Sequence, residues 1–285
     1  MGGSVFLNNG FSSNGAVRSA GARIGSNLYF DGASLENPKG HALHALDVQV
    51  KGAFRLDGFA RRPVGRVNLD HSGTHVFFDD ETGWPESGML EINGFTYDEL
   101  GHTSPTKAAK RLEWLRLQPK SPFRPQPYEQ LAKVLHGMGH LSDANSIRVA
   151  KQDDLRVYGE LRGWEWFKNW FLGATIGHGY MPLRVIGWIV GSIIFWRLCY
   201  GLAYCYGVLM VDNGSSRELA AVHLLILAID KFLPIVDLGS SAGWRIDTTR
   251  LGGSLLQLFE LAYMLVGWFF TALAAAALAG LMKRE

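Results

Sequence analysis

Five charged side chains fall within the apolar runs 185–211, 219–239 and 255–281 of this 285-residue chain, and they are the groups there that are most able to do chemistry. They are Arg197, Asp230, Lys231, Asp237 and Glu260. Arg197 is the single charge of residues 185–211, and Glu260 is the single charge of residues 255–281. The other three fall in AIDKFLPIVDLG (228–239). Because charges inside a bilayer are costly and usually face water, a bundle interior or one another, the pattern predicts an intramembrane charge network that either lines an ion pathway or holds helices together.

Depth counted along the helices predicts partners within this network. Arg197 lies 12 residues, about 18 Å, beyond the cytoplasmic start of its helix, close to the depth expected for Asp230. We therefore expect Arg197 to pair with Asp230 or Asp237. Glu260 falls near the far end of its helix, out of reach of Arg197, and is expected to line an outer mouth. Pro234 is expected to end the preceding helix, because proline cannot donate the next hydrogen bond.

Neither metal nor redox chemistry is predicted. The closely spaced histidines fall in strand-and-turn context, where solvated loop histidines are more usual than metal ligands: His41 with His44, and His71 with His75. Cys199 and Cys205 are six residues apart in one apolar run and would point to different faces of a helix. The chain has no C-x-x-C, no P-loop, no Ser/His/Asp elbow and no G-x-G-x-x-G between a strand and a helix. We therefore predict no catalytic residue, no cofactor and no metal, and hence no enzymatic activity.

Composition divides the chain in two and excludes one class of partner. Residues 1–170 are rich in Gly, Asn, Asp, Arg and His, whereas residues 185–285 contain long apolar runs. The net charge of +2, without a basic cluster interleaved with aromatic residues, argues against nucleic-acid binding. The fold class that we predict is a multi-domain membrane protein. It has an N-terminal β-solenoid, a helical connector and a C-terminal α-helical membrane domain of two transmembrane helices plus a re-entrant helix.

Residues 1–90 have the pattern of a β-solenoid. Short alternating runs such as NLYF (27–30), AFRL (53–56) and HVFF (75–78) are separated by Gly, Asn or Asp, which is typical of strands joined by turns. Their spacing of roughly 11 to 15 residues favours stacked coils over a small all-β sandwich, which stays the alternative. Terminal coils need protection and no cap precedes Val5, so we expect a truncated fragment or a partner covering that end.

Residues 91–161 are predicted to form a helical connector. TSPTKAAKRLEWLRLQ (103–118) carries helix-capping residues and an apolar stripe. Apolar residues at helical spacing within 122–161 predict two antiparallel helices that are separated near Gly137 and Gly139. This hairpin resembles a tetratricopeptide-like unit, so it is either a packed spacer or a protein-binding groove.

Two runs are long enough to cross a membrane. Residues 185–211 and 255–281 each hold 27 residues, enough to span a ~30 Å hydrocarbon core with tilt. The segment 218–239 between them has 11 apolar residues at 219–229, about 16 Å of helix, which suits a re-entrant helix. A soluble or interfacial hairpin is the alternative for this segment.

Aromatic and basic residues mark the predicted membrane interfaces. Residues 162–184 are predicted to form an interfacial amphipathic helix, and the predicted anchors are Trp164, Trp166, Trp170 and Trp244. No positive segment followed by an apolar one opens the chain, so no signal peptide is predicted. Lys283 and Arg284 directly follow the second crossing. We therefore expect the N-terminal region and the C-terminus in the cytoplasm and the helices in a bacterial inner membrane.

Three stretches carry a family resemblance. DDETGWP (79–85), LEINGFTYDEL (90–100) and FRPQPYEQLAKVLHGMGHLSDANSI (123–147) resemble bacterial proteins labelled "membrane-associated oxidoreductase". The resemblance implies a Gly-rich, pentapeptide-like or bactofilin-like N-terminal repeat region and C-terminal membrane helices. The oxidoreductase chemistry that the label implies has no matching cofactor motif in this sequence.

The predicted order of helix, half-depth helix, returning loop and final helix resembles the pore module of two-helix potassium-type channels. The sequence departs from that module because FLPIVDLG (232–239) stands where T-V-G-Y-G would form the selectivity filter. Our first hypothesis is an oligomeric pore-forming membrane protein with a cytoplasmic sensing or docking region. The alternatives are a membrane-anchored scaffold and a membrane-associated oxidoreductase. The expected partners are the lipid bilayer, further copies of the chain through the small residues of 271–280, and a protein at the solenoid or the hairpin.

Overall fold

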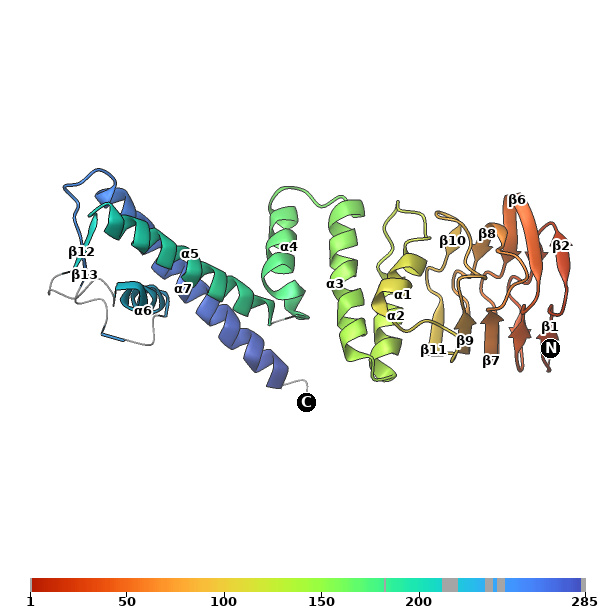
Figure 1. The fold of residues 1–285 in the computed structure, drawn as a ribbon. Coiled ribbons are helices and arrows are strands. Elements are labelled where there is room, and N and C mark those ends of the chain that lie inside the picture. Colours follow the sequence, from red (N-terminus) through yellow and green to blue (C-terminus); the bar gives the residue numbers. More distant parts are fainter. Residues whose placement is uncertain (1, 182, 212–219, 234–237, 240–243, 283–285) are drawn as a thin grey trace. The chain divides into compact units, whose positions relative to one another are not determined.

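The computed structural model of the chain describes residues 2–181, 183–211, 220–233, 238–239 and 244–282. The chain forms two compact units, Met1–Gly173 and Ala174–Glu285. Figure 1 shows that the strands of the first unit are followed by helices α1 to α3, whereas the second unit is built around helices α5, α6 and α7.

The first unit begins with two sheets of parallel strands. One sheet contains β1 (Val5–Phe6), β4 (Arg23–Ile24), β5 (Leu28–Tyr29), β7 (Gln49–Leu56), β9 (Gly73–Asp79) and β11 (Thr96–Leu100). The other contains β2 (Ser12–Asn14), β3 (Val17–Arg18), β6 (Ser34–His44), β8 (Val64–Asn68) and β10 (Leu90–Glu91). Val5 lies opposite Leu28, and Phe54 lies opposite Phe77, so one coil takes about 23 residues and contributes to both sheets. The predicted β-solenoid is confirmed, and the sandwich is excluded because hairpin-joined strands would pair antiparallel.

A stack of phenylalanines fills the solenoid interior. Phe30, Phe54, Phe77 and Phe95 are each at most 1% exposed. Their ring centroids follow one another at 6.2, 6.3 and 5.0 Å. Because successive coils supply one ring each, every coil buries its apolar face only against its neighbours.

The last coil extends beyond residue 90, where the solenoid was predicted to end. The chain turns at Gly94, whose φ of +76° suits glycine, and continues into β11. Thr96 lies opposite Gly73 and Leu100 lies opposite Phe77, so the stretch LEINGFTYDEL belongs to the solenoid and not to the connector.

Three helices follow the solenoid: α1 (Ala108–Leu115), α2 (Gln126–Gly137) and α3 (Leu141–Tyr158). The predicted inner faces of the hairpin are buried, namely Tyr128, Leu131 and Leu135 in α2 and Ala144 and Ile147 in α3. Gly139, with φ of +84°, stands between the two helices, as expected for a glycine that ends a helix in the left-handed region. These faces and the solenoid interior share one apolar core.

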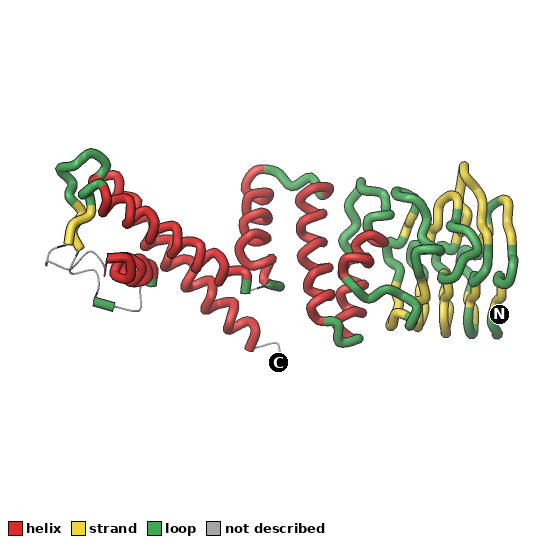
Figure 2. Tube along the Cα trace, viewed as in Figure 1, coloured by secondary structure: helices red, strands yellow, loops and turns green. Residues whose placement is uncertain are grey.

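Helix α4 (Gly163–Ile176) crosses the division between the units, and further helices and strands follow among the described residues of the second unit. They are η1 (Gly177–Gly179), α5 (Arg184–Cys205), β12 (Leu209–Val211), α6 (Ala220–Phe232), β13 (Trp244–Ile246) and α7 (Gly253–Met282). Figure 2 shows the helical character of this unit and the short β12–β13 pair. Two of its helices, α5 and α7, are long and apolar enough to cross a membrane, as the sequence predicted.

Helix α5 is shorter than the predicted span of 185–211. It ends at Cys205, and Gly207 follows with a φ of +70°. Leu209–Val211 then pairs antiparallel with Trp244–Ile246. The apolar residues after the helix are therefore those of a strand, because periodicity alone does not separate a short buried strand from the last turns of a helix.

Candidate functional site: the charged network of the helical unit

One ion pair joins two helices of the second unit. Lys231 Nζ on α6 lies 3.2 Å from Glu260 Oε1 on α7, and the two side chains are 24% and 13% exposed. Tyr200 on α5 is fully buried, and its hydroxyl donates a hydrogen bond of 3.1 Å to the same carboxylate oxygen. Helices α5, α6 and α7 therefore meet at Glu260.

A second contact holds α6 against α7 one turn further along. The hydroxyl of Tyr263, which is 2% exposed, donates a hydrogen bond of 2.8 Å to the carbonyl oxygen of Ala228. The Tyr263 ring also packs against Trp196 and Phe232, with centroids 4.6 and 5.4 Å away. A Cβ placed on Gly267 would lie 2.0 Å from the carbonyl oxygen of Phe232, so a glycine is needed there for the end of α6 to approach α7.

Of the two partners predicted for Arg197, Asp230 forms no ion pair with it, and Asp237 lies outside the described residues. Arg197 is half-buried, and no carboxylate of the described residues lies within ion-pair distance of it. Asp230 instead accepts a hydrogen bond of 2.7 Å from the backbone N–H of Leu238. Counting residues along a helix gives the depth of each side chain in the membrane but not the face of the helix on which it lies. Adjacent residues of a helix point about 100° apart, so the face decides the partner. Lys231 faces α7, and its neighbour Asp230 points elsewhere.

The position of Glu260 at an outer mouth stays a prediction; in the single chain this carboxylate is mostly buried and paired. Sequence reasoning missed this pair because it tested Glu260 against Arg197 alone. The available signal was that Lys231 and Glu260 are of opposite sign on consecutive helices. Pro234 and Asp237 lie outside the described residues.

The predicted anchors fall on two elements. Trp164, Trp166 and Trp170 lie on α4 and are 72%, 44% and 44% exposed. Trp244 lies in β13, is half-buried and meets Tyr204 edge-on at 5.9 Å. The α4 tryptophans are thus exposed within the chain, and their role as membrane-interface anchors stays a prediction.

The stretches that carry the family resemblance build the cap of the solenoid. Arg111 of α1 is fully buried, and its guanidinium donates to both carboxylate oxygens of Asp79, at 2.7 and 2.8 Å. Trp84 Nε1 donates to the same carboxylate at 2.8 Å, and Arg111 Nε donates to the carbonyl oxygen of Pro105. The aspartate and tryptophan of DDETGWP therefore fix α1 over the end of the solenoid.

Helix α2 supplies the hydrogen bonds that a further coil would otherwise make. Gln126 accepts a bond of 2.8 Å from the N–H of Gly94 and donates one to the carbonyl of Phe95. Gln130 donates a bond of 2.6 Å to the carbonyl of Tyr97. Since unpaired groups on a sheet edge recruit other strands, the PQPYEQLA segment protects this edge.

The hairpin has its own polar contact. The Tyr128 hydroxyl donates a bond of 2.8 Å to Asp154, whose carboxylate also pairs with Arg116. Burial, followed by the charge of Asp154, raises the pKa of Tyr128 well above its ordinary value. The phenol therefore stays protonated and joins α2 to α3.

Within the described ranges, no three His, Cys, Asp or Glu side chains gather to hold a metal ion. His41 lies beside Glu91, with Nε2 3.5 Å from the carboxylate, and His75 pairs with Asp98 at the surface. Cys199 and Cys205 are both free thiols.

No family model, curated protein or solved structure matches this chain. The resemblance to proteins labelled "membrane-associated oxidoreductase" therefore stays a prediction.

Proposed function

We propose that this chain is a membrane-anchored scaffold, in which α5 and α7 cross a bilayer and the capped solenoid serves as the docking region. The outward surfaces of α5 and α7 support the anchor: in the apolar windows of the two helices, only 11% and 17% of the residues are buried. Exposed apolar side chains on α7 include Leu258, Leu265 and Trp268, at 62%, 71% and 62%. An apolar surface of this extent in water would promote association, whereas lipid covers it.

The internal pairing of Lys231 with Glu260 is the observation that favours a scaffold over a pore. An ion pathway needs charges that face water. In the single chain, these two charges neutralise each other, and Tyr200 donates to the carboxylate as well. The network therefore acts as a clamp between helices.

Helix α6 fits the proposed half-depth position between the two crossings. It has 13 residues, about 20 Å of helix, which is too short for a ~30 Å hydrocarbon core. Two crossings would leave the solenoid and the C-terminus on the same side, which we propose is the cytoplasmic side of a bacterial inner membrane.

Arg197 favours a second candidate function, the oligomeric pore. Its charge lies on α5 and has no acidic partner among the residues that the structure describes. A charge in a membrane helix needs a counter-charge or water, and a carboxylate from another copy of the chain would supply one. If such copies enclose water, the assembly is a pore.

Extraction and topology measurements test the anchor. The full chain is expected to stay in the membrane pellet after extraction at alkaline pH. Cysteines introduced at Lys51 and in residues Lys283–Glu285 are expected to be protected from a membrane-impermeant thiol reagent in right-side-out vesicles. Release into the supernatant would contradict the anchor.

A photo-crosslinker at exposed Lys51 is expected to give one defined protein adduct, and its absence would contradict the docking role. A flavin or haem absorbance in the purified protein would instead support the oxidoreductase.

A further inference from the structure

A cavity of about 210 Å³ lies in the first unit between the segment that joins α1 to α2 and the end of α3. Its walls are largely apolar and aromatic, with Leu115, Phe123, Tyr128 and Tyr158 among them. The volume is below the roughly 300–1,000 Å³ of pockets that take drug-sized ligands. The cavity therefore suits a small molecule.

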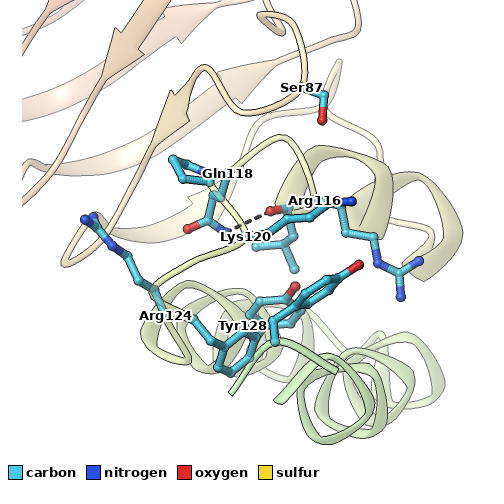
Figure 3. Close-up of a pocket in the computed structure, with 10 residues that line it drawn as sticks. Ser87, Arg116, Gln118, Lys120, Arg124 and Tyr128 are labelled. Atoms are coloured by element: carbon cyan, nitrogen blue, oxygen red, sulfur yellow. Dashed lines mark hydrogen bonds between the residues drawn. The ribbon is translucent and has the colours of Figure 1, made fainter. Parts of the chain in front are cut away.

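Three cations surround the opening, and two of them are already paired. Arg116 pairs with Asp154 at 3.1 Å, and Arg124 pairs with Asp70 at 3.2 Å. Lys120 has no carboxylate within ion-pair distance in the part of the chain that the structure describes, and its Nζ lies 5.5 Å from the ring centroid of Tyr158. Figure 3 shows Arg124 and Arg116 on either side of Lys120, with Tyr128 below them in this view. The opening thus carries one uncompensated positive charge.

Gln118 adds a polar group to the wall. Its Nε2 donates a bond of 2.8 Å to the carbonyl of Leu115, the dashed line in Figure 3. Its carbonyl oxygen is shielded from solvent and accepts no hydrogen bond from any described group. An ionised carboxylate carries no donor and would leave this acceptor unpaired, so Gln118 contributes polarity to the wall but no hydrogen bond to a ligand of that class.

We infer that this cavity binds a small aromatic carboxylate. The ring lies against Phe123, Tyr128 and Tyr158, because aromatic rings pack favourably on one another. The carboxylate lies at the opening and pairs with Lys120. A single uncompensated cation matches one carboxylate better than a doubly charged phosphate, because the two arginines are held by Asp154 and Asp70.

This site is independent of the proposed membrane anchor, since it lies wholly within the first unit. It touches α1, α2 and α3 at the polar contact between Tyr128, Asp154 and Arg116. A bound ligand would therefore stabilise the cap of the solenoid.

Calorimetric titration of the full chain in lipid nanodiscs with benzoate tests the site. Benzoate is expected to bind saturably. Benzyl alcohol, which lacks the charge, and acetate, which lacks the ring, are each expected to bind at least about tenfold more weakly. Lys120→Gln is expected to weaken benzoate binding by about tenfold and to leave benzyl alcohol unchanged. The control Lys133→Gln removes the same charge from an exposed position on α2 outside the cavity and is expected to bind benzoate as the parent does.

Added salt gives a second measurement that does not depend on a variant. Benzoate affinity is expected to fall with ionic strength, because the carboxylate and Lys120 meet at a solvent-accessible opening. The proposal is overturned if no saturable binding of benzoate occurs, if Lys120→Gln binds benzoate unchanged, or if Lys133→Gln loses as much. Salt-independent binding also overturns it.

Discussion

Two ion pairs, one in each unit, use the same chemistry in different surroundings. Asp79 and Arg111 are 1% and 0% exposed, meet through two parallel hydrogen bonds and are further bonded by Trp84 and Pro105. Lys231 and Glu260 are 24% and 13% exposed and share one additional bond, from Tyr200. In the first pair, the guanidinium donates three hydrogen bonds and the carboxylate accepts three. The second has less support, so it acts as a clamp that is expected to be weaker than the cap.

The largest effect is expected from Arg111→Met. The change leaves Asp79 buried without its partner, which costs about 3–5 kcal/mol in comparable pairs. Hydrogen exchange followed by mass spectrometry should show loss of protection in β9 and β11. The double variant Asp79→Asn/Arg111→Met should recover most of that protection. Lys110→Met removes exposed ion pairs with Glu81 and Glu113 and is the control, with little or no expected loss of stability because solvent screens both pairs. An effect of Arg111→Met as small as that of the control would break the comparison.

A smaller effect is expected from Glu260→Gln, because the remaining Lys231 is partly exposed. We expect a cost of about 1–3 kcal/mol in thermal unfolding of the second unit in detergent. Lys231→Met should cost a similar amount, and the double variant should cost less than the two single changes together, since the charges interact. Strictly additive losses would show that the two side chains do not support each other.

Gly267→Ala tests the close approach of the end of α6 to α7. The new Cβ would overlap the carbonyl oxygen of Phe232, and overpacking of this kind costs about 1–3 kcal/mol. Gly191→Ala on α5 is the matched control, because nothing lies within 4 Å of the added Cβ. That control is expected to be neutral or to stabilise the helix by up to about 1 kcal/mol, as alanine favours helices. Equal shifts of the melting temperature in both variants would argue against the close approach.

The smallest effect is expected for the pH dependence of stability that a third ion pair, Asp57 with Arg55, contributes to the first unit. Burial raises the pKa of Asp57, but hydrogen bonds from Arg55 and Thr103 outweigh it and hold the pKa below its ordinary value of 3.8. A carboxylate with a lowered folded-state pKa contributes stability above its unfolded pKa and loses it as the pH falls through the folded value. The first unit should therefore lose stability on acidification below about pH 4. Asp57→Asn should lose less over that range, as judged by denaturant unfolding at each pH.

The sequence predicts the repeated elements better than the side chains that join them. The coils around Phe30, Phe54 and Phe77 and the two-helix hairpin follow from periods of apolar residues, which report burial directly. The buried Arg111 was not predicted, because an arginine on a short helix is normally exposed. The capping roles of Gln126 and Gln130 depend on backbone groups about 30 residues away in the sequence. The ion pair predicted between Arg197 and Asp230 does not form, which the sequence could not show because it does not give the rotation of each helix about its axis.

Ion flux through liposomes that contain the purified full chain tests the central claim most directly. A scaffold whose Lys231 and Glu260 neutralise each other predicts flux no greater than that of protein-free liposomes, for the parent chain and for Arg197→Gln and Glu260→Gln alike. Flux in the parent chain that either substitution abolishes or changes in selectivity would contradict the scaffold and support the pore.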